Sequence, residues 1–487
     1  MPDEPAAPGQ LHHRGPEPNI IVVSILCGIC LFASLHVASG AGWAATIAIA
    51  CLLALPVAGW QLLKLRERYL LGLATIVALL VLLFNNTPAE LYRTALERAA
   101  YLAAFIMILS LLRDAAMTSE SVLAVGKMLT RQPPGRRYWT IALGGHAMGV
   151  IMNFGALSLL GPLVQRGARA GGQEVDPRIT AVRERRQLSA LARGFSWFIA
   201  WSPSAISQVV AVTVVTGASS ANVALYGAIA AVLVLVAGWL DDRAVGTKAR
   251  RQLTGGQPLQ PLPPDPFPTT EIRRLLLVYA TLAAVSAAIA ISLSLPLVTG
   301  IMLAATPVTI VWIYGQIASG RADERSFSNR VRDLAMKTIP DGSPEAITLA
   351  LAGFSGTALA ILVPGGENGS AGVMRELPPF FTYLFVLTTV PVASLAGLPA
   401  MLMVTFLGTF LSGALGDHIN PDLLALSLIC GWAVNLNASP FGGTNLILSR
   451  ITRIPATTLS FRWNLVFSLM AWAICALVLL TSSALTW

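Results

Sequence analysis

The sequence predicts an all-α polytopic membrane protein, and three observations support this fold class. Hydrophobic residues make up 55% of the 487 residues, whereas charged residues make up only 12%. Soluble domains carry about 25% charged residues, and the mean hydropathy of this chain is +0.68. Charge-free segments of membrane-spanning length recur along the chain. So few charges could not cover a soluble surface, which excludes a soluble enzyme, a disordered protein and a nucleic-acid binder.

Charge-free segments predict about eleven transmembrane helices. A helix needs about 20 apolar residues to cross about 30 Å of hydrocarbon. The net charge of +9 agrees with a membrane protein, since Lys and Arg collect in cytoplasmic loops. The five cysteines lie in apolar runs and predict packed thiols. The predicted spans fall within residues 18–63 (two spans), 69–89, 99–112, 194–240 (two), 275–320 (two), 346–366, 423–449 and 463–487.

Basic loops predict the orientation of the spans. Clusters of Lys and Arg mark cytoplasmic loops at residues 64–68, 113–137, 166–193, 241–274, 321–337 and 450–462. Turns near residues 39–41, 217–221 and 293–295 carry no Lys or Arg, and the turn at 417–422 is acidic. We therefore expect a cytoplasmic N-terminus and a periplasmic C-terminus in the cytoplasmic (inner) membrane of a bacterium.

Two apolar segments predict re-entrant hairpins. Segment 138–165 has basic loops on both sides, so both of its ends face the cytoplasm. It is too short for two crossings, and its tip is expected near Asn153 and Gly155. Segment 377–416 must begin and end outside and turn near Gly397. The turn of such a hairpin lies within the membrane. Irregular backbone there is tolerated only where it is buried in protein or lines a water-filled cavity.

The two halves of the chain also resemble each other. Gly194, Ser202, Pro203, Ser207 and Gln208 align without gaps with Gly431, Ser439, Pro440, Thr444 and Asn445. Pro133, Pro134 and Tyr138 align with Pro378, Pro379 and Tyr383, and Pro56 aligns with Pro307. Coincidence is the alternative explanation, but the charge-based topology independently predicts two copies of opposite orientation. The expected organisation is a disordered cytoplasmic tail (1–18), an extra transmembrane helix (19–38), repeat 1 (39–240), a cytoplasmic linker (241–272) and repeat 2 (273–487).

This arrangement resembles the ion transporter superfamily of secondary transporters. The superfamily includes divalent-anion/sodium symporters, citrate carriers, arsenite permeases and some sodium/proton antiporters. The segment from Asn437 to Asn445 is similar to the polar, glycine-containing break that such carriers place in their last broken helix. The chain lacks the Ser-Asn-Thr signature expected at the hairpin tips of the dicarboxylate branch. The resemblance therefore implies transport by alternating access without implying a dicarboxylate substrate.

Polar residues around the two predicted helix breaks form the candidate binding site. Pro203 and Pro440 lack an amide hydrogen, so each interrupts the helical hydrogen bonds. The freed amides can bind an anion, and the freed oxygens can bind sodium. Alternatively, the polar side chains only satisfy kinked helices. The candidates are Asn153, Gly155, Ser202, Pro203, Ser204, Ser207, Gln208, Ser394, Gly397, Asn435, Asn437, Ser439, Pro440, Gly442, Gly443, Thr444 and Asn445.

The titratable groups favour sodium over protons as the coupling ion. His146 is the candidate proton relay, with a neutral, hydrogen-bonded histidine as the alternative. No Asp or Glu lies in the middle of a predicted span, whereas proton-driven antiporters need such a carboxylate. Asp114 and Glu345 stand at span ends and are expected to be solvated.

These observations predict a secondary active transporter of a small organic or inorganic anion, not an enzyme. We expect no cofactor and no metal site, with Na⁺ as the coupling ion and H⁺ as the alternative. The expected partners are a small-molecule or ion substrate, the lipid bilayer and a second copy of the chain in a homodimer, with no nucleic acid. One alternative is an exporter or antiporter of the same fold. A membrane-embedded enzyme acting on lipid-linked substrates is the alternative from another class.

Overall fold

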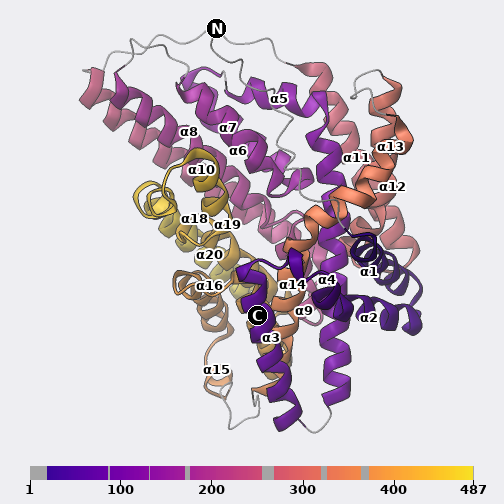
Figure 1. Ribbon diagram of the computed structural model, residues 1–487. Coiled ribbons are helices and arrows are strands. Elements are labelled where there is room, and N and C mark those ends of the chain that lie inside the picture. Colours follow the sequence, from indigo (N-terminus) through magenta and orange to yellow (C-terminus); the bar gives the residue numbers. More distant parts are fainter. Residues whose placement is uncertain are drawn as a thin grey trace.

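The computed structural model describes residues 19–85, 88–130, 132–169, 176–254, 268–319, 326–363 and 372–485 (Figure 1). These residues form α-helices, short 3₁₀ and π turns and connections, with no strand among them. Ten of the described helical segments are long and apolar enough to cross a membrane. The predicted all-α polytopic membrane fold is therefore confirmed.

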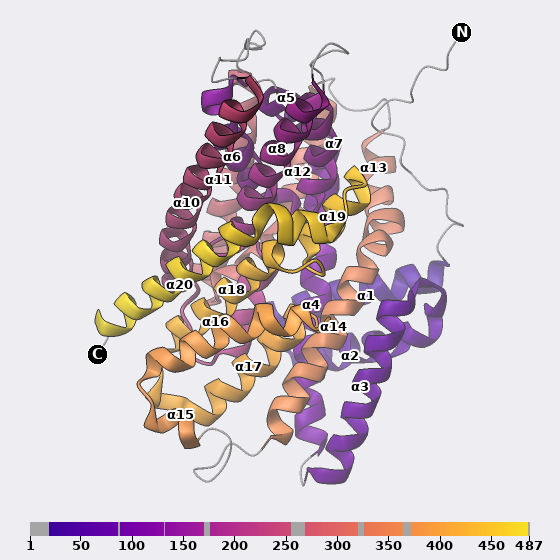
Figure 2. The ribbon, with the colours of Figure 1, turned by 90° about the vertical axis from the view of Figure 1, so that its left-hand side faces the viewer.

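The long helices run between two ends of the molecule (Figures 1 and 2). The helices α3 (Leu65–Phe84) and α14 (Ile339–Leu362) end at the lower end in Figure 1, where α4 (Pro88–Met117) begins. The helix α11 (Thr269–Ser292) starts at the upper end and α12 (Leu297–Ala318) returns to it. Consequently α4 and α14, which pack along each other, are antiparallel.

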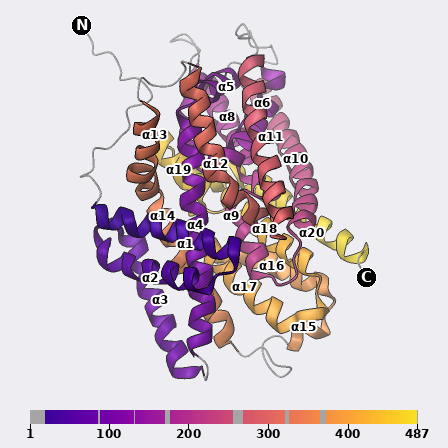
Figure 3. The same ribbon diagram turned by 90° about the vertical axis from the view of Figure 1, so that its right-hand side faces the viewer.

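The two N-terminal helices form a pair of their own beside α4. The helices α1 (Ile20–Ser39) and α2 (Gly42–Ala58) pack against each other and lie crosswise to α4 (Figure 3). At 17 residues α2 falls short of the length that a full span requires.

Both predicted hairpins are present. Hairpin 1 consists of α6 (Pro134–Met152) and α7 (Gly155–Arg169), and hairpin 2 of α16 (Pro379–Leu395) and α17 (Ala400–Leu415). Each tip contains a residue with positive φ, namely Asn153 (48°) and Gly397 (88°). Such a backbone is unusual for a residue other than glycine, so the tip of hairpin 1 is held in a strained turn.

Both predicted helix breaks are also present. The first separates α8 (Pro177–Phe198) from α9 (Ile206–Val214), and the second separates α18 (Pro421–Ala438) from α19 (Gly443–Thr452). The halves end in α10 (Ser220–Thr254) and α20 (Leu465–Leu485). The remaining elements are α5 (Glu120–Thr130), α13 (Phe327–Asp333), α15 (Gly372–Glu376), π-helical turns at Leu334–Thr338 and Thr458–Asn464, and 3₁₀ turns at Trp60–Leu62 and Gly416–His418.

Equivalent glycines join the hairpin to the broken helix in each half. A Cβ on Gly194 of α8 would collide with the carbonyl group of Ala142 in α6. In the second half, a Cβ on Gly431 of α18 would lie 3.2 Å from the carbonyl oxygen of Leu387 in α16. The sequence alignment pairs Gly194 with Gly431, and its hairpin segment pairs Ala142 with Leu387. The same close helix contact is therefore built twice, as the predicted repeat requires.

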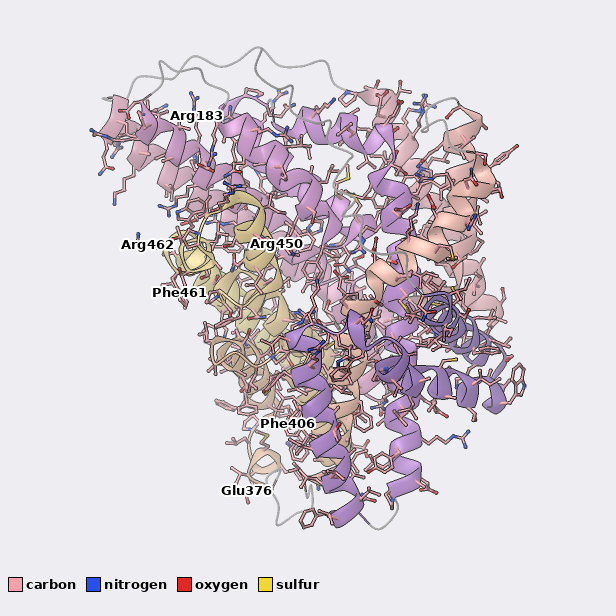
Figure 4. All side chains as sticks on the ribbon, in the orientation of Figure 1. Arg183, Glu376, Phe406, Arg450, Phe461 and Arg462 are labelled. Atoms are coloured by element: carbon pink, nitrogen blue, oxygen red, sulfur yellow. The ribbon has the colours of Figure 1, made fainter. Side chains whose placement is uncertain are left out.

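Several helix ends differ from the predicted spans. The basic segment 166–193 is not a loop, because α8 already begins at Pro177, and Arg183 lies toward the upper end (Figure 4). Likewise, residues 241–254 of the predicted linker continue α10. The helix α4 extends well beyond the predicted 99–112. Charge marks where a helix leaves the hydrocarbon, but hydrogen bonding continues into the polar region. The tail 1–18 and residues 255–267 of the linker lie outside the described residues.

The membrane-spanning set also differs from the predicted eleven. The short α2 and the arginine-rich α8 are not among the ten apolar spans, whereas the hairpin arm Ala400–His418 is. Arg193 of α8 is accommodated inside the protein. Arg193 donates to Asp241 Oδ2 at 2.7 Å, Asn464 Oδ1 at 2.9 Å and the Gly238 carbonyl at 2.9 Å. This ion pair ties α8 to α10 and to the π turn before α20.

Candidate functional site

The second helix break is held by a buried side chain that binds backbone carbonyls on the other side of the break. The side-chain amide of Asn445 donates to the carbonyls of Asn437 (3.1 Å) and Ser439 (2.9 Å). A Cβ on Gly442 would lie 2.7 Å from the Asn435 carbonyl oxygen and 3.0 Å from that of Leu436. Only glycine fits at this position without moving backbone. The break is thus a tight turn that brings the end of α18 against the start of α19.

The first helix break has the same construction. The side-chain amide of Gln208 donates to the carbonyl of Ala200 at 2.9 Å, and Ser207 Oγ donates to that of Ile199 at 2.7 Å. Each acceptor lies eight residues before its donor, as Asn437 does before Asn445. In both halves, a polar residue at the start of the second half-helix therefore holds the end of the first.

Each hairpin packs against the break of its own half. Ser204 Oγ donates to the Val150 carbonyl near the tip of hairpin 1 at 2.6 Å, and Ser202 Oγ lies 2.8 Å from Ser204 Oγ. In the second half, Ser439 Oγ donates to the Ser394 carbonyl of hairpin 2 at 3.3 Å. A hairpin residue near the tip thus contacts the helix break in both halves.

Contacts between the halves unite the two breaks in one cluster. Ser196 Oγ of α8 lies 3.2 Å from Thr444 Oγ1 of α19. The ring of Phe154, at the tip of hairpin 1, would lie 2.9 Å from a Cβ on Gly443. Hairpin 1 therefore reaches from the break of the first half to the break of the second half.

Several amide atoms in this cluster are buried without a hydrogen-bond partner among the described residues. They are Gln208 Oε1, Asn435 Oδ1, Asn437 Oδ1 and Nδ2, and Asn445 Oδ1. Their side chains are at most 3% exposed. An unsatisfied buried polar atom costs about 1–3 kcal/mol. Neutral amide and carbonyl oxygens are the hard ligands that suit a sodium ion, so the donor set fits the expected coupling ion.

His146 is held by hydrogen bonds at both ring nitrogens. Its Nδ1 lies 3.0 Å from the Gly194 carbonyl oxygen, so Nδ1 carries the proton and donates. Trp201 Nε1 donates to His146 Nε2 at 2.7 Å. Accepting a further proton would break the bond to Trp201. This geometry favours the neutral histidine, and a proton relay at His146 remains a prediction.

The predicted site residues do not all join the cluster. Ser202, Ser204, Ser207, Gln208, Ser394, Asn435, Asn437, Ser439, Thr444 and Asn445 are all at most 4% exposed. Pro203 and Pro440 are half-buried in the breaks, and Gly442 and Gly443 lie at the start of α19. Asn153 forms the strained turn at the tip of hairpin 1. Gly397 stands apart, since a Cβ there would meet nothing within 4 Å.

Arg113, a charged residue near hairpin 1, differs from its predicted position. Arg113 was expected in a cytoplasmic loop, but it lies on α4 with its side chain across Gly155. Glu345 and Asp114 were expected to be solvated, and their side chains are 43% and 34% exposed, although they pair with Arg113 at 3.5 Å and with Arg330 at 3.7 Å. The sequence signal for Arg113 was its position at the end of an apolar run, which is equally typical of an arginine that extends toward the membrane surface.

Comparison with known proteins supports the fold. No family model and no curated protein matches the sequence. Among solved structures, this chain is similar to the YdaH transporter of Alcanivorax borkumensis, which is described as having an unusual topology. The similarity has a TM-score of 0.61 at 14% sequence identity and covers 87% of this chain and 99% of the YdaH chain. The chain therefore has the fold of a polytopic helical transporter.

Proposed function

We propose that this protein is a secondary active transporter that moves a small anion across the cytoplasmic membrane by alternating access. Sodium is the coupling ion in this proposal. The observation that carries it is the pair of equivalent helix breaks, each held by a side-chain amide and each covered by a hairpin. A fold that places such breaks together inside the membrane is typical of secondary transporters. The similarity to YdaH, itself a transporter, supports the same conclusion.

The amide oxygens of the cluster supply the proposed coupling site. Asn435, Asn437 and Asn445 each hold a buried side-chain oxygen without a hydrogen-bond partner in the described part of the chain. Binding of sodium would satisfy these oxygens. The start of α19 directs backbone amides and the positive end of a helix dipole toward the same region, where an anion is stabilised.

The hairpins and broken helices form the proposed mobile unit, and α4, α12 and α14 belong to the proposed scaffold. The side chains of Ser196 and Thr444 link the two breaks, so both would move together. The scaffold helices α4 and α14 pack along each other, as expected of a rigid support. Exposed apolar side chains on α2, α3, α10 and α11 would face lipid or a second copy of the chain.

Transport of carboxylates by the purified protein tests this proposal. Proteoliposomes would be supplied with radiolabelled succinate, citrate or benzoate, with and without an inward sodium gradient. The proposal expects uptake of at least one of these anions and acceleration by the sodium gradient. No uptake of any of them under any gradient would contradict the substrate class. Uptake that ignores sodium but follows a proton gradient would contradict the coupling ion.

The two alternatives make different predictions. An exporter or antiporter of the same fold would protect cells against toxic anions, so a deletion strain would grow more poorly on arsenite or drugs. A membrane-embedded enzyme would need a cluster of acids, histidines or a nucleophile with its base at one membrane face. In the cluster described above, the one histidine has both ring nitrogens engaged, and the remaining polar groups are amides and hydroxyls.

A further inference from the structure

Arg113 occupies an unusual position at the tip of hairpin 1. Its Cδ and Cγ would lie 2.8 and 2.9 Å from a Cβ on Gly155, so its stem passes directly over that glycine. The neighbouring tip residue Phe154 contacts Gly443, the first residue of α19. Arg113 therefore lies where the scaffold helix α4 meets the hairpin that covers the candidate site.

Most N–H donors of the Arg113 guanidinium have no hydrogen-bond partner among the described residues. An arginine carries five N–H donors in a planar fork. Among the described residues, the Arg113 guanidinium makes a single hydrogen bond, to Glu345 Oε2 at 3.5 Å, which is the outer limit of a hydrogen bond. The Arg113 side chain is 23% exposed and that of Glu345 is 43% exposed. The pair is therefore loose and accessible.

Arg193 shows what a purely structural arginine looks like in the same protein. Its side chain is 3% exposed, and three of its nitrogens donate at 2.7–2.9 Å to Asp241, Asn464 and Gly238. It also stacks over the ring of Phe467. Arg113 has none of these features, so stabilisation of the fold does not account for it.

Among the described residues, one acid pairs with Arg113. Asp114, next in the chain, pairs with Arg330, whose Nη2 also donates to Thr118 Oγ1 at 2.7 Å. Glu345 is thus the acid that faces Arg113 from the packed helix α14. A carboxylate or phosphate-like group binds a guanidinium fork through two parallel hydrogen bonds, which the present contact does not provide.

We propose that Arg113 binds the negatively charged group of the transported anion, and that Glu345 competes with this anion for the guanidinium. This inference rests on the proposed function and names the residue that would select an anionic substrate. When substrate enters beside hairpin 1, Arg113 would exchange its weak contact with Glu345 for a bidentate pair with the anion. Because Arg113 belongs to α4 and the tip to hairpin 1, the anion would bridge the scaffold and the mobile unit.

The test is anion binding by four variants of the full-length protein. Thermal unfolding in detergent would be followed against rising succinate, citrate or benzoate, with sodium present. Arg113→Gln is expected to weaken the apparent affinity at least tenfold, and Arg113→Lys to weaken it less, since lysine keeps the charge but not the fork. Glu345→Gln is expected to strengthen it severalfold, because the competing carboxylate is gone. The control is Arg93→Gln on the same helix, in an exposed pair with Glu97, and it should leave the affinity unchanged.

The outcomes separate this inference from the proposed function. If wild-type protein binds an anion and Arg113→Gln binds it equally well, Arg113 is not the anion-binding residue. Weaker binding by Glu345→Gln would also overturn the inference, since it would make the pair a structural support. If wild-type protein shows neither anion-dependent stabilisation nor uptake, the anion substrate itself is contradicted, and the inference falls with it.

Discussion

Gln208 and Asn445 make the same hydrogen bond in opposite halves of the protein. Each side-chain amide donates to the carbonyl eight residues earlier, Ala200 in one half and Asn437 in the other. The sequence alignment pairs both the two donors and the two acceptors. Each amide keeps its side-chain oxygen buried and without a partner in the described chain. Equivalent residues thus hold equivalent breaks, and in both halves the side-chain oxygen of that residue is left without a partner among the described residues.

Replacing Asn437 by Ala should remove ligand binding without damaging the fold. Both polar side-chain atoms of Asn437 are buried and make no hydrogen bond within the described residues, so their loss breaks no hydrogen bond there. We expect an unchanged melting temperature in potassium chloride and loss of any extra stabilisation in sodium chloride. Thermal unfolding in the two salts measures this directly. Asn445→Ala, which loses two hydrogen bonds, is expected to lower the baseline stability by about 1–3 kcal/mol as well. If both variants were stabilised by sodium as much as the wild-type protein is, Asn437 and Asn445 would not belong to the sodium site.

Replacing Gly442 by Ala should distort the second break. The new methyl group would meet the carbonyl oxygens of Asn435, Leu436 and Ser439 at 2.7–3.0 Å, and these are backbone atoms that cannot rotate away. Overpacking of this kind costs about 1–3 kcal/mol, and we expect transport to be lost. Gly413→Ala in α17 is the control, since a Cβ there meets nothing within 4 Å. The unfolding temperature and the transport flux of both variants are measured. If Gly442→Ala were as stable and as active as Gly413→Ala, the break would not be tightly packed.

Replacing His146 by Gln should leave the pH dependence of transport unchanged. The glutamine oxygen can accept the hydrogen bond from Trp201, and in the native protein both ring nitrogens are already engaged. Initial uptake rates would be measured from pH 5.5 to 8 for both proteins. A variant that still follows a sodium gradient but has lost a proton-driven component would establish His146 as the relay after all.

Replacing Arg193 by Met should be strongly destabilising. It would leave the partly buried Asp241 at the α8–α10 contact without its charged partner, and breaking a buried ion pair costs about 3–5 kcal/mol. Removing both charges in Arg193→Met, Asp241→Leu should recover a large part of this loss. Arg93→Met, in the exposed pair with Glu97, should cost less than about 1 kcal/mol. The melting temperatures of the three variants test this order of stability. A double variant no more stable than Arg193→Met would contradict the prediction.

The re-entrant course of hairpin 1 can be tested by cysteine labelling. Arg136 at the start of α6 and Arg166 near the end of α7 are both exposed. In a background without native cysteines, Arg136→Cys and Arg166→Cys should react with a membrane-impermeant reagent from the cytoplasmic side. Asp417→Cys should react from the opposite side. Labelling of Arg136→Cys and Arg166→Cys from opposite sides would mean that the segment crosses the membrane.

Different parts of the structure were predictable to different degrees. The helix breaks were predicted from Pro203 and Pro440 because polar residues surround both and the two match in the repeat, whereas Pro56 and Pro307 lie inside continuous helices. The hairpins follow from basic residues on both sides of one short segment. Helix ends did not follow, because Arg178 to Arg193 continue α8 and the charge of Arg193 is neutralised by Asp241, distant in sequence. Arg113 was missed for a similar reason, since its contact with Gly155 arises only from the packing of α4 on hairpin 1.

The hydrogen bond between Ser196 and Thr444 restricts how this protein can change shape. It joins the last turn of α8 to the first turn of α19, so separating the two halves of the site would break this bond. Any cycle that keeps this bond must shift both interruptions together, as one rigid block sliding along its neighbours. The rate of the transport cycle would then depend on the contacts between that block and α4.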